Sequence, residues 1–267
     1  MGLIVDVHAH LDHPYLRHRL ASIVKNAKEA GLHCIITNGL EMVSNRAALD
    51  ISEKYDIIKP ALGIYPPDAL RNELKQAFEE GYIQKKDSVY PEFNFDEEMD
   101  FIRKKVHKII AIGEIGLDYN NNPDIQLQKN IFSSLIETAI KKSKPIIVHS
   151  RKAESDVMEI LEGYNYKKTV MHCFSGKKAL IKKGVDLGFS FSVPANVVKS
   201  THFQNLVDIV PLSHLLTETD SPFLSPFKDK QNEPAFVTES IKKISEIKKL
   251  EFEEASRIVF MNFKNMF

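Results

Sequence analysis

Short apolar runs alternate with helical patterns along this chain, and this alternation limits its fold more than any other feature. The apolar runs are rich in branched residues and predict strands over 3–7, 34–37, 57–62, 109–112, 145–148, 169–171, 188–193 and 215–217. Apolar residues at helical spacing predict helices over 16–30, 43–55, 96–107, 124–142, 153–161, 178–187, 201–209, 235–250 and 252–267. Strands that alternate with helices form a parallel sheet, and eight such units in 267 residues favour an α/β fold closed into a TIM-type (β/α)8 barrel.

The alternative architecture is an open, doubly wound sheet, which normally carries a glycine-rich phosphate-binding turn after its first strand. This chain has His8-Ala9-His10 at that position, so the barrel is favoured. We expect one domain over residues 1–267, because the strand–helix pattern continues without a linker. The stretch from 68 to 100 is less regular, and we interpret it as an insertion in one connection, with a helix over 69–80.

Composition argues against several classes of protein. Lys plus Arg and Asp plus Glu both number 36, so no overall positive charge indicates nucleic-acid binding, and any such site must be a local patch. The two cysteines, Cys34 and Cys173, are too few for a disulfide framework and fit a reducing compartment. The N-terminal segment meets charge and histidine too early for a signal peptide, and no apolar run approaches the roughly 20 residues that span a bilayer. We therefore expect a cytoplasmic protein with no membrane partner.

Residues that can bind metal stand at the ends of five expected strands. These residues are His8, His10, Glu114, His149, His172 and Asp220. The ends of barrel strands converge at one rim, so the six side chains are expected to lie together. Each has an ordinary explanation when taken alone, such as a surface turn, a core histidine or a helix cap. The other six histidines lie away from strand ends, so the set as a whole favours a metal site.

The size of the set bears on how many ions it would hold. Four imidazoles and two carboxylates exceed the ligands of one tetrahedral ion that keeps a water molecule. Two divalent ions with a bridging carboxylate would use the whole set. Imidazole-rich ligation suits zinc, iron or nickel and the carboxylates suit magnesium or manganese, and we expect Zn, Mn or Mg. Cys173 follows His172 directly, and strand alternation predicts that its side chain points the other way, into the core.

Five ordered motifs carry a family resemblance over nearly the whole chain: DVHAHLD, GEIGLDY, IIVHSR, HCFSG and TETDSPFL. They resemble the signature blocks of the TatD family of metal-dependent deoxyribonucleases, within the amidohydrolase superfamily. The NEPAFV run that starts at Asn232 resembles the C-terminal block of that family. The resemblance implies a TIM barrel, two divalent ions and hydrolysis of DNA phosphodiesters. It places His8, His10, Glu114 and Asp220 around one ion and Glu114, His149 and His172 around the other, with Glu114 as the bridge.

The chain departs from the family pattern in two places where substrate is expected to lie. The family often has a His-Pro-His run after the third strand, whereas this chain has Tyr65-Pro66-Pro67. The family usually has an arginine before the Asn-Glu-Pro block, and this chain has Lys228 and Lys230 in that region. The departures concern the substrate rather than the metal ligands.

The expected activity is exonucleolytic hydrolysis of DNA, single-stranded or at 3′ ends, with no obligate protein partner. Asp220 is expected to ligate one ion and accept the proton of the attacking water. We assign Arg151 to phosphate binding, and Tyr65 and Asn232 to substrate binding. We also expect a basic rim that contacts the nucleic-acid backbone and aromatic residues that stack on bases. The rim residues are Lys177, Lys178, Lys228 and Lys230, and the aromatic residues are Tyr65, Phe174 and Phe223.

Two other functions fit parts of this pattern. A metal-dependent ester or amide hydrolase, such as a deacylase of misacylated D-aminoacyl-tRNA, would use the same fold and metal site. A metal-binding or nucleic-acid-binding module without catalysis is disfavoured, because the ligand set is complete for a reactive centre.

Overall fold

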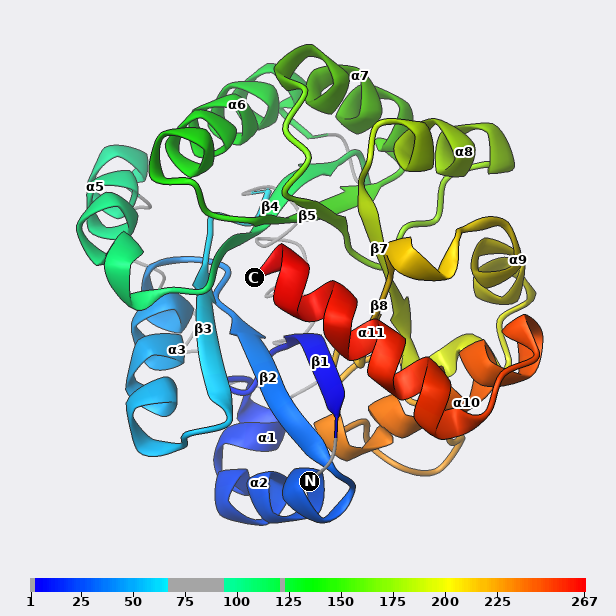
Figure 1. Ribbon diagram of the computed structural model, residues 1–267. Helices are drawn as coiled ribbons and strands as arrows, with labels where there is room; N and C mark the ends of the chain where they lie inside the picture. Colours follow the sequence, from blue (N-terminus) through cyan, green and yellow to red (C-terminus); the bar gives the residue numbers. More distant parts are fainter. Residues whose placement is uncertain (1–2, 67–93, 121–122) are drawn as a thin grey trace.

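The computed structural model describes residues 3–66, 94–120 and 123–267. The strands of these residues form one eight-stranded parallel sheet in sequential order, which wraps into a barrel ringed by helices (Figure 1). The strands are β1 (Ile4–Ala9), β2 (Leu32–Asn38), β3 (Ile58–Leu62), β4 (Ala111–Asp118), β5 (Ile146–Arg151), β6 (Thr169–Met171), β7 (Ser190–Pro194) and β8 (Leu215–Glu218). The predicted TIM-type barrel is confirmed.

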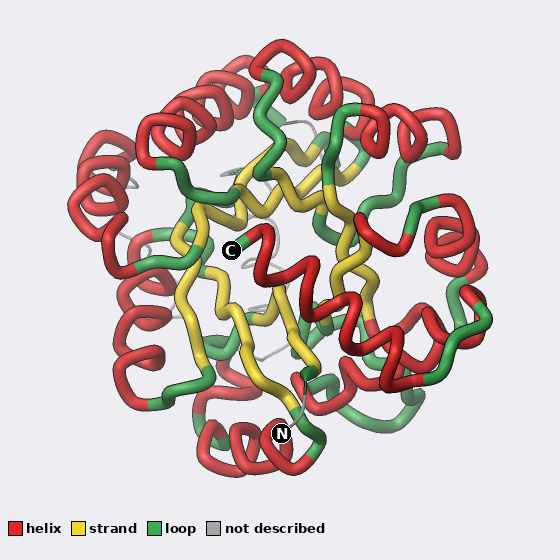
Figure 2. Tube along the Cα trace, viewed as in Figure 1, coloured by secondary structure: helices red, strands yellow, loops and turns green. Residues whose placement is uncertain are grey.

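The helices lie outside the barrel and alternate with its strands (Figure 2). The α-helices are α1 (Pro14–Arg17), α2 (Leu20–Glu29), α3 (Met42–Lys54), α5 (Phe95–Lys105), α6 (Ile125–Lys142), α7 (Glu154–Tyr164), α8 (Lys178–Asp186), α9 (Thr201–Ile209), α10 (Thr238–Lys248) and α11 (Phe252–Met266). Short 3-10 helices are η2 (Val106–Lys108), η3 (Ala195–Val198), η4 (Leu212–His214) and η5 (Pro234–Val237). None of these helices is both long and apolar enough to span a membrane.

The first predicted helix, over 16–30, is two helices in the structure. Pro14 begins α1 two residues earlier, and the His13 side chain accepts a hydrogen bond from the Tyr15 N–H. Arg19 then has φ −117° and ψ 15°, which ends the first helix before α2 begins at Leu20. Most of the predicted insertion over 68–100, including the helix over 69–80, lies outside the described residues.

Strands β1, β4 and β5 run two or more residues further than the sequence predicts, so that His8, Glu114 and His149 lie inside these strands rather than beyond their ends. We expected the glycines around Glu114 to end the strand. Both glycines instead allow β4 to approach β5 closely. A Cβ on Gly113 would lie 2.7 Å from Cβ of Ile147, and one on Gly116 would collide with the carbonyl oxygen of His149.

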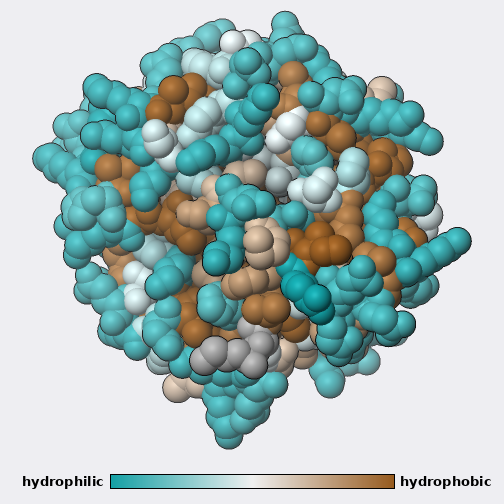
Figure 3. Space-filling view, in the orientation of Figure 1, coloured by the Kyte–Doolittle hydropathy of each residue, from teal (hydrophilic) through white to brown (hydrophobic). Residues whose placement is uncertain are grey.

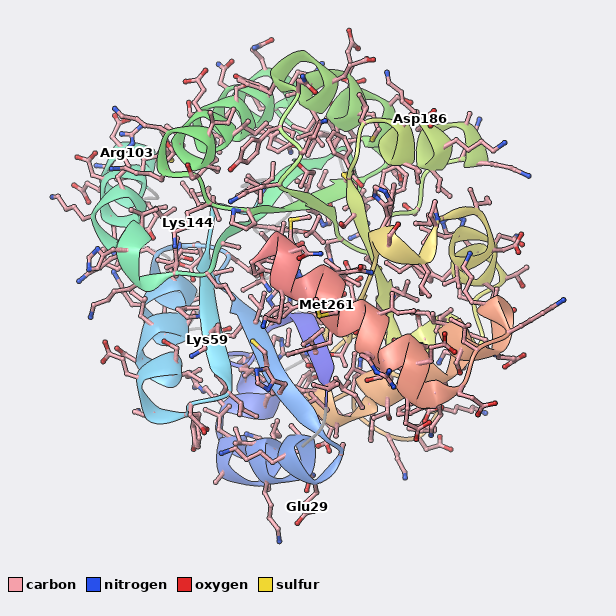
Figure 4. The ribbon with its side chains drawn as sticks, viewed as in Figure 1. Glu29, Lys59, Arg103, Lys144, Asp186 and Met261 are labelled. Carbon is pink, nitrogen blue, oxygen red and sulfur yellow. The ribbon has the colours of Figure 1, made fainter. Side chains whose placement is uncertain are left out.

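Helix α11 covers the end of the barrel where the strands begin, and Figure 1 shows it crossing that opening. Its Ser256 hydroxyl donates to the carbonyl of Leu3, and its Asn262 amide donates to the carbonyls of Leu212 and Leu215. Figure 4 places Met261 on this helix, while Glu29, Arg103 and Asp186 lie near the ends of surrounding helices. Hydrophilic residues line the edge of this face, and hydrophobic patches lie among hydrophilic residues further in (Figure 3). The strand ends that carry the predicted ligands therefore lie at the opposite end of the barrel.

The barrel closes between β1 and β8 through side chains as well as backbone. Fully buried Asp6 accepts hydrogen bonds from the backbone N–H of Thr219 at 2.9 Å and from its hydroxyl at 2.6 Å. The hydroxyl of Thr217 donates to the carbonyl of Val5 at 2.6 Å. Beyond these contacts, an isolated bridge joins Ala9 to Ser221. Closure of the barrel thus depends on a buried polar seam.

This seam predicts a stability effect for Thr219→Val, which keeps the shape of the side chain but removes the hydroxyl that reaches Asp6. Leaving a buried carboxylate oxygen without its donor should lower the free energy of unfolding by about 1–3 kcal/mol. Urea denaturation in the presence of chelator measures the effect apart from metal binding. Thr201→Val, at an exposed position in α9, is the matched control. Equal stability of the two variants would contradict the role of the seam.

Candidate metal centre

The six predicted ligands converge at the end of the barrel opposite α11. Nε2 of His8 lies 3.1 Å from Oε2 of Glu114, and Nδ1 of His149 lies 2.8 Å from Oε1 of the same carboxylate. Nε2 of His10 lies 3.2 Å from Nε2 of His8. Among the described residues, the ligating atoms form three groups in which all atoms lie within 4.8 Å of one another. Two of them contain only predicted ligands, namely His8, His10 and Asp220, and Glu114, His149 and His172, and the third joins His8 and His172 to Glu218.

Glu114 lies between two pairs of imidazoles, and each of its oxygens faces a different pair. Oε2 lies 3.1 Å from Nε2 of His8 and 3.5 Å from Nε2 of His10. Oε1 lies 2.8 Å from Nδ1 of His149 and 3.8 Å from Nε2 of His172. The side chain is almost fully buried, at 4% exposed. Its position inside β4 therefore puts one carboxylate at the middle of the cluster.

Asp220 approaches the cluster from the loop after β8. Its Oδ1 lies 3.4 Å from Nε2 of His10, 3.7 Å from Nε2 of His8 and 4.0 Å from Nε2 of His172. The backbone is held in place because the Asp220 N–H donates to the carbonyl of His8 at 2.8 Å. Its side chain is 15% exposed, whereas that of Glu114 is 4% exposed. Asp220 therefore has more access to solvent than the carboxylate at the middle.

Hydrogen bonds on the outer side of three rings indicate which nitrogens face inward with a lone pair. Nδ1 of His10 lies 3.1 Å from the carbonyl oxygen of Asn38, so this nitrogen must donate. Nε2 of His149 lies 3.1 Å from Asp118, and Nδ1 of His172 lies 2.7 Å from Glu218. A neutral imidazole that donates on one side presents a lone pair on the other.

The inward lone pairs converge on carboxylate oxygens, which carry lone pairs of their own. Such an arrangement is repulsive unless protons or cations lie between the groups. The outer hydrogen bonds also match the usual surroundings of metal-binding histidines, which donate their second N–H to a carboxylate or carbonyl. The donor set therefore fits divalent cations.

When protons rather than cations lie between the imidazoles and carboxylates of the cluster, these groups shift the pKa values of one another. Burial disfavours charge on the imidazoles, but the nearby carboxylates outweigh burial and raise the pKa of His10 to about 10 and those of His149 and His172 to about 9. Burial and the charge of His172 lower the pKa of His8, whose ring stacks on that of His172 with centroids 3.6 Å apart. Although burial opposes it, the surrounding imidazoles hold the pKa of Glu114 well below its usual range. Metal binding here must displace protons.

Asp118 and Glu218 are functional residues that the sequence interpretation missed. Glu218 is fully buried and accepts hydrogen bonds from His172, from the Ser192 hydroxyl at 2.7 Å and from the Cys173 N–H at 2.9 Å. Because both of its oxygens are already occupied, it orients His172. Asp118 is also fully buried and accepts from the Asn120 N–H at 2.8 Å.

A period-two pattern could have identified Asp118. Glu114 and Asp118 are four residues apart in β4, so their side chains share one face of the strand. The predicted strand ends at 112, so neither residue lies within it and the pattern is not visible. Glu218 is two residues before Asp220, but its role depends on contacts with β6 and β7 that no local pattern shows.

The predicted substrate residues lie in different surroundings. Tyr65 is buried, and its hydroxyl lies 3.4 Å from both Asp118 Oδ2 and His149 Nε2. The Arg151 side chain is 51% exposed, with Nη1 4.0 Å from Asp118. Asn232 is fully buried, and its amide donates to the carbonyls of Thr219 and Phe223 in the loop that carries Asp220. These contacts give Asn232 a clear part in holding that loop.

Two side-chain placements differ from expectation. Phe174 is fully buried and packs against Phe191 with ring centroids 5.6 Å apart, so it cannot stack on a base. Cys173 is only partly buried, because it follows β6 at φ 44°, where strand alternation no longer sets side-chain direction. Burial and the carboxylates of Glu218 and Asp220 raise the pKa of its thiol.

The four predicted rim lysines, Lys177, Lys178, Lys228 and Lys230, are exposed.

Comparison with known proteins finds similarity over the whole length of the chain. A family model described as "TatD related DNase" matches residues 5–267. "Uncharacterized metal-dependent hydrolase YabD" of Bacillus subtilis is 31% identical over 274 residues, which covers 99% of this chain and 99% of the relative. "Deoxyribonuclease TATDN3" of Homo sapiens is 27% identical over 99% of this chain and 94% of its own. The crystal structure of YJJV, a TatD homologue from Escherichia coli, superposes with a TM-score of 0.83 at 22% identity, over 99% of this chain and 98% of that one, and shows the same fold.

The contacts of Glu218 predict the effect of Glu218→Gln on metal affinity. The amide keeps one accepting oxygen, but its NH₂ group would face donors, either the Cys173 N–H or the His172 ring and the Ser192 hydroxyl. Loss of such support typically weakens metal binding by about 10–100-fold. Competition with a chromophoric chelator measures the change, and Glu253→Gln, at an exposed position of α11, is the control. Unchanged affinity in Glu218→Gln would mean that this carboxylate does not support the centre.

Proposed function

Since this chain belongs to the TatD related DNase family, we propose that it is a metal-dependent hydrolase that cleaves phosphodiester bonds in DNA. The family model spans residues 5–267, and the human relative is named a deoxyribonuclease. The Bacillus subtilis relative is named a metal-dependent hydrolase, which agrees with the donor set of the cluster. We expect exonucleolytic attack on DNA that is single-stranded, or at 3′ ends.

The position of Glu114 carries the proposal of two ions. One of its oxygens faces His8 and His10, and the other faces His149 and His172. A carboxylate placed in this way can be shared between two cations and offset the repulsion between them. His8, His10, Glu114 and Asp220 would hold one ion, and Glu114, His149 and His172 the other, with Zn, Mn or Mg as the candidates.

Divalent ions bound there would lower the pKa of water and stabilise negative charge on phosphoryl oxygens. Asp220 then accepts the proton of the attacking water, which requires hydrogen-bond reach to that water. Its partial exposure, 15%, and its place on the loop after β8 give it that access from the solvent side. Glu114 is more deeply buried and acts as a ligand.

Arg151 and Tyr65 lie on the other side of the cluster, beside His149. Half of the Arg151 side chain is exposed, and the buried carboxylate of Asp118 lies 4.0 Å from Nη1. The planar guanidinium can bind two oxygens of a phosphate at once. We assign Arg151 to the substrate phosphate and Tyr65 to the wall of the site next to His149.

A panel of single-stranded DNA, duplex DNA and D-aminoacyl-tRNA tests the proposal. The purified protein, stripped with chelator and then supplied with Mg, Mn or Zn, should hydrolyse single-stranded or duplex DNA only when an ion is present. Asp220→Asn should keep most of its metal and lose turnover by about 10²–10⁴-fold, the usual contribution of a general base.

Two outcomes of the panel would contradict the proposed DNA hydrolysis or its dependence on metal. DNA cleavage that survives exhaustive chelation would contradict metal dependence. Release of the amino acid from D-aminoacyl-tRNA, with DNA left intact, would favour the deacylase alternative.

A second prediction concerns Glu114→Ala and His149→Ala. If Glu114 bridges two ions, its removal should lower the metal content of both sites, whereas His149→Ala should weaken mainly one. The second ion should bind Glu114→Ala much more weakly than the first, because the charge that offsets their repulsion is gone. Metal analysis and titration of activity with Mn or Zn measure the difference. Two tightly bound ions in Glu114→Ala would overturn the bridging role.

A further inference from the structure

An exposed aromatic ring borders the metal centre on the side of Asp220. Phe223 lies three residues after Asp220 and is 47% exposed. Its ring centroid lies 6.2 Å from that of His10 and 5.4 Å from that of His13, in edge-on arrangements. Water around such a ring is released when a flat apolar partner covers it, so the position favours a ligand.

The loop that carries this ring is firmly held. The Phe223 N–H donates to the carbonyl of Asp220 at 2.9 Å, and the Phe223 carbonyl accepts from the amide of buried Asn232. The same amide donates to the carbonyl of Thr219 at 2.8 Å. A ring whose backbone is already ordered loses little conformational entropy when it binds a partner.

We propose that Phe223 is the stacking platform for a nucleobase next to the scissile phosphodiester. The proposal rests on the proposed function, because a base and its phosphate are joined through one sugar and must occupy neighbouring sites. Every nucleobase has a π-face, so stacking on Phe223 would bind DNA without selecting one base. His13 and Tyr15, whose rings lie 5.0 Å apart, extend the aromatic surface on the α1 side.

Phe227, in the same loop, offers a matched comparison. It is 38% exposed, close to the value for Phe223. Its ring, however, already packs edge-on against Phe236 at 5.0 Å, and the ammonium of Lys230 lies 5.3 Å from its centroid. Phe227 thus packs against η5 and Lys230, whereas Phe223 lies beside His10, one of the residues of the metal centre.

The test measures binding without turnover. Fluorescence anisotropy with a labelled single-stranded oligodeoxynucleotide, in chelator, compares wild type with Phe223→Ala, Phe223→Leu, Phe223→Tyr and Phe227→Ala. A second set of oligonucleotides replaces one nucleotide at a time, from the 3′ end, by an abasic residue. Circular dichroism checks that each variant is folded.

We expect Phe223→Ala and Phe223→Leu to weaken binding roughly 5- to 150-fold, which corresponds to about 1–3 kcal/mol for one stacked base. Phe223→Tyr should bind like wild type because it keeps the ring, and Phe227→Ala should change affinity by less than about twofold. At one abasic position the difference between wild type and Phe223→Ala should vanish, because the base that stacks is absent.

Failure of this proposal differs from failure of the proposed function. If wild type binds and cleaves DNA, but Phe223→Ala loses no more affinity than Phe227→Ala, the platform is wrong and the activity stands. An equal loss for Phe223→Ala at every abasic position would also overturn it. If wild type neither binds nor cleaves DNA, both proposals fall.

Discussion

The contact between Asp6 and Thr219 is the interaction on which the rest of the structure depends. It joins the first strand to the end of the last, where an isolated bridge and a few side chains complete the barrel. His8 lies two residues from Asp6, and its N–H donates to the same carboxylate at 3.1 Å. Asp220 follows Thr219 directly. One buried carboxylate therefore sets the distance between ligands more than 200 residues apart in the chain.

Bringing these ligands together has an energetic cost. Buried carboxylates and imidazoles lose hydration, and the inward lone pairs repel one another unless a positive charge lies between them. The outer shell of Asn38, Asp118 and Glu218 prevents the rings from turning away from this arrangement. The protein thus holds in place a site that cations stabilise. Burial of the large apolar core offsets the free-energy cost of bringing these polar side chains together.

Much of the fold and of the ligand set could be predicted from the sequence, because both follow from local periodicity. Alternating strands and helices imply a barrel, and a barrel brings strand ends to one rim. The errors arose where tertiary contacts override a local rule. Gly113 looks like the end of a strand, but it permits close approach to Ile147 inside one. Phe174 has an aromatic ring that could stack on a base, but this ring is buried against Phe191.

Asn232, assigned from the sequence to substrate binding, shows that contacts between residues distant in the chain decide what surrounds a site residue. Its amide reaches back to the carbonyls of Thr219 and Phe223, which flank Asp220 in the loop after β8. Asp220, the proposed proton acceptor, and Phe223, the ring proposed to bind a base, are therefore carried on one anchored segment. Because one buried amide holds the carbonyls of both Thr219 and Phe223, the positions of Asp220 and Phe223 are coupled. This coupling arises from contacts between residues that are distant in the chain. It gives Asn232 a structural role that no local sequence pattern shows.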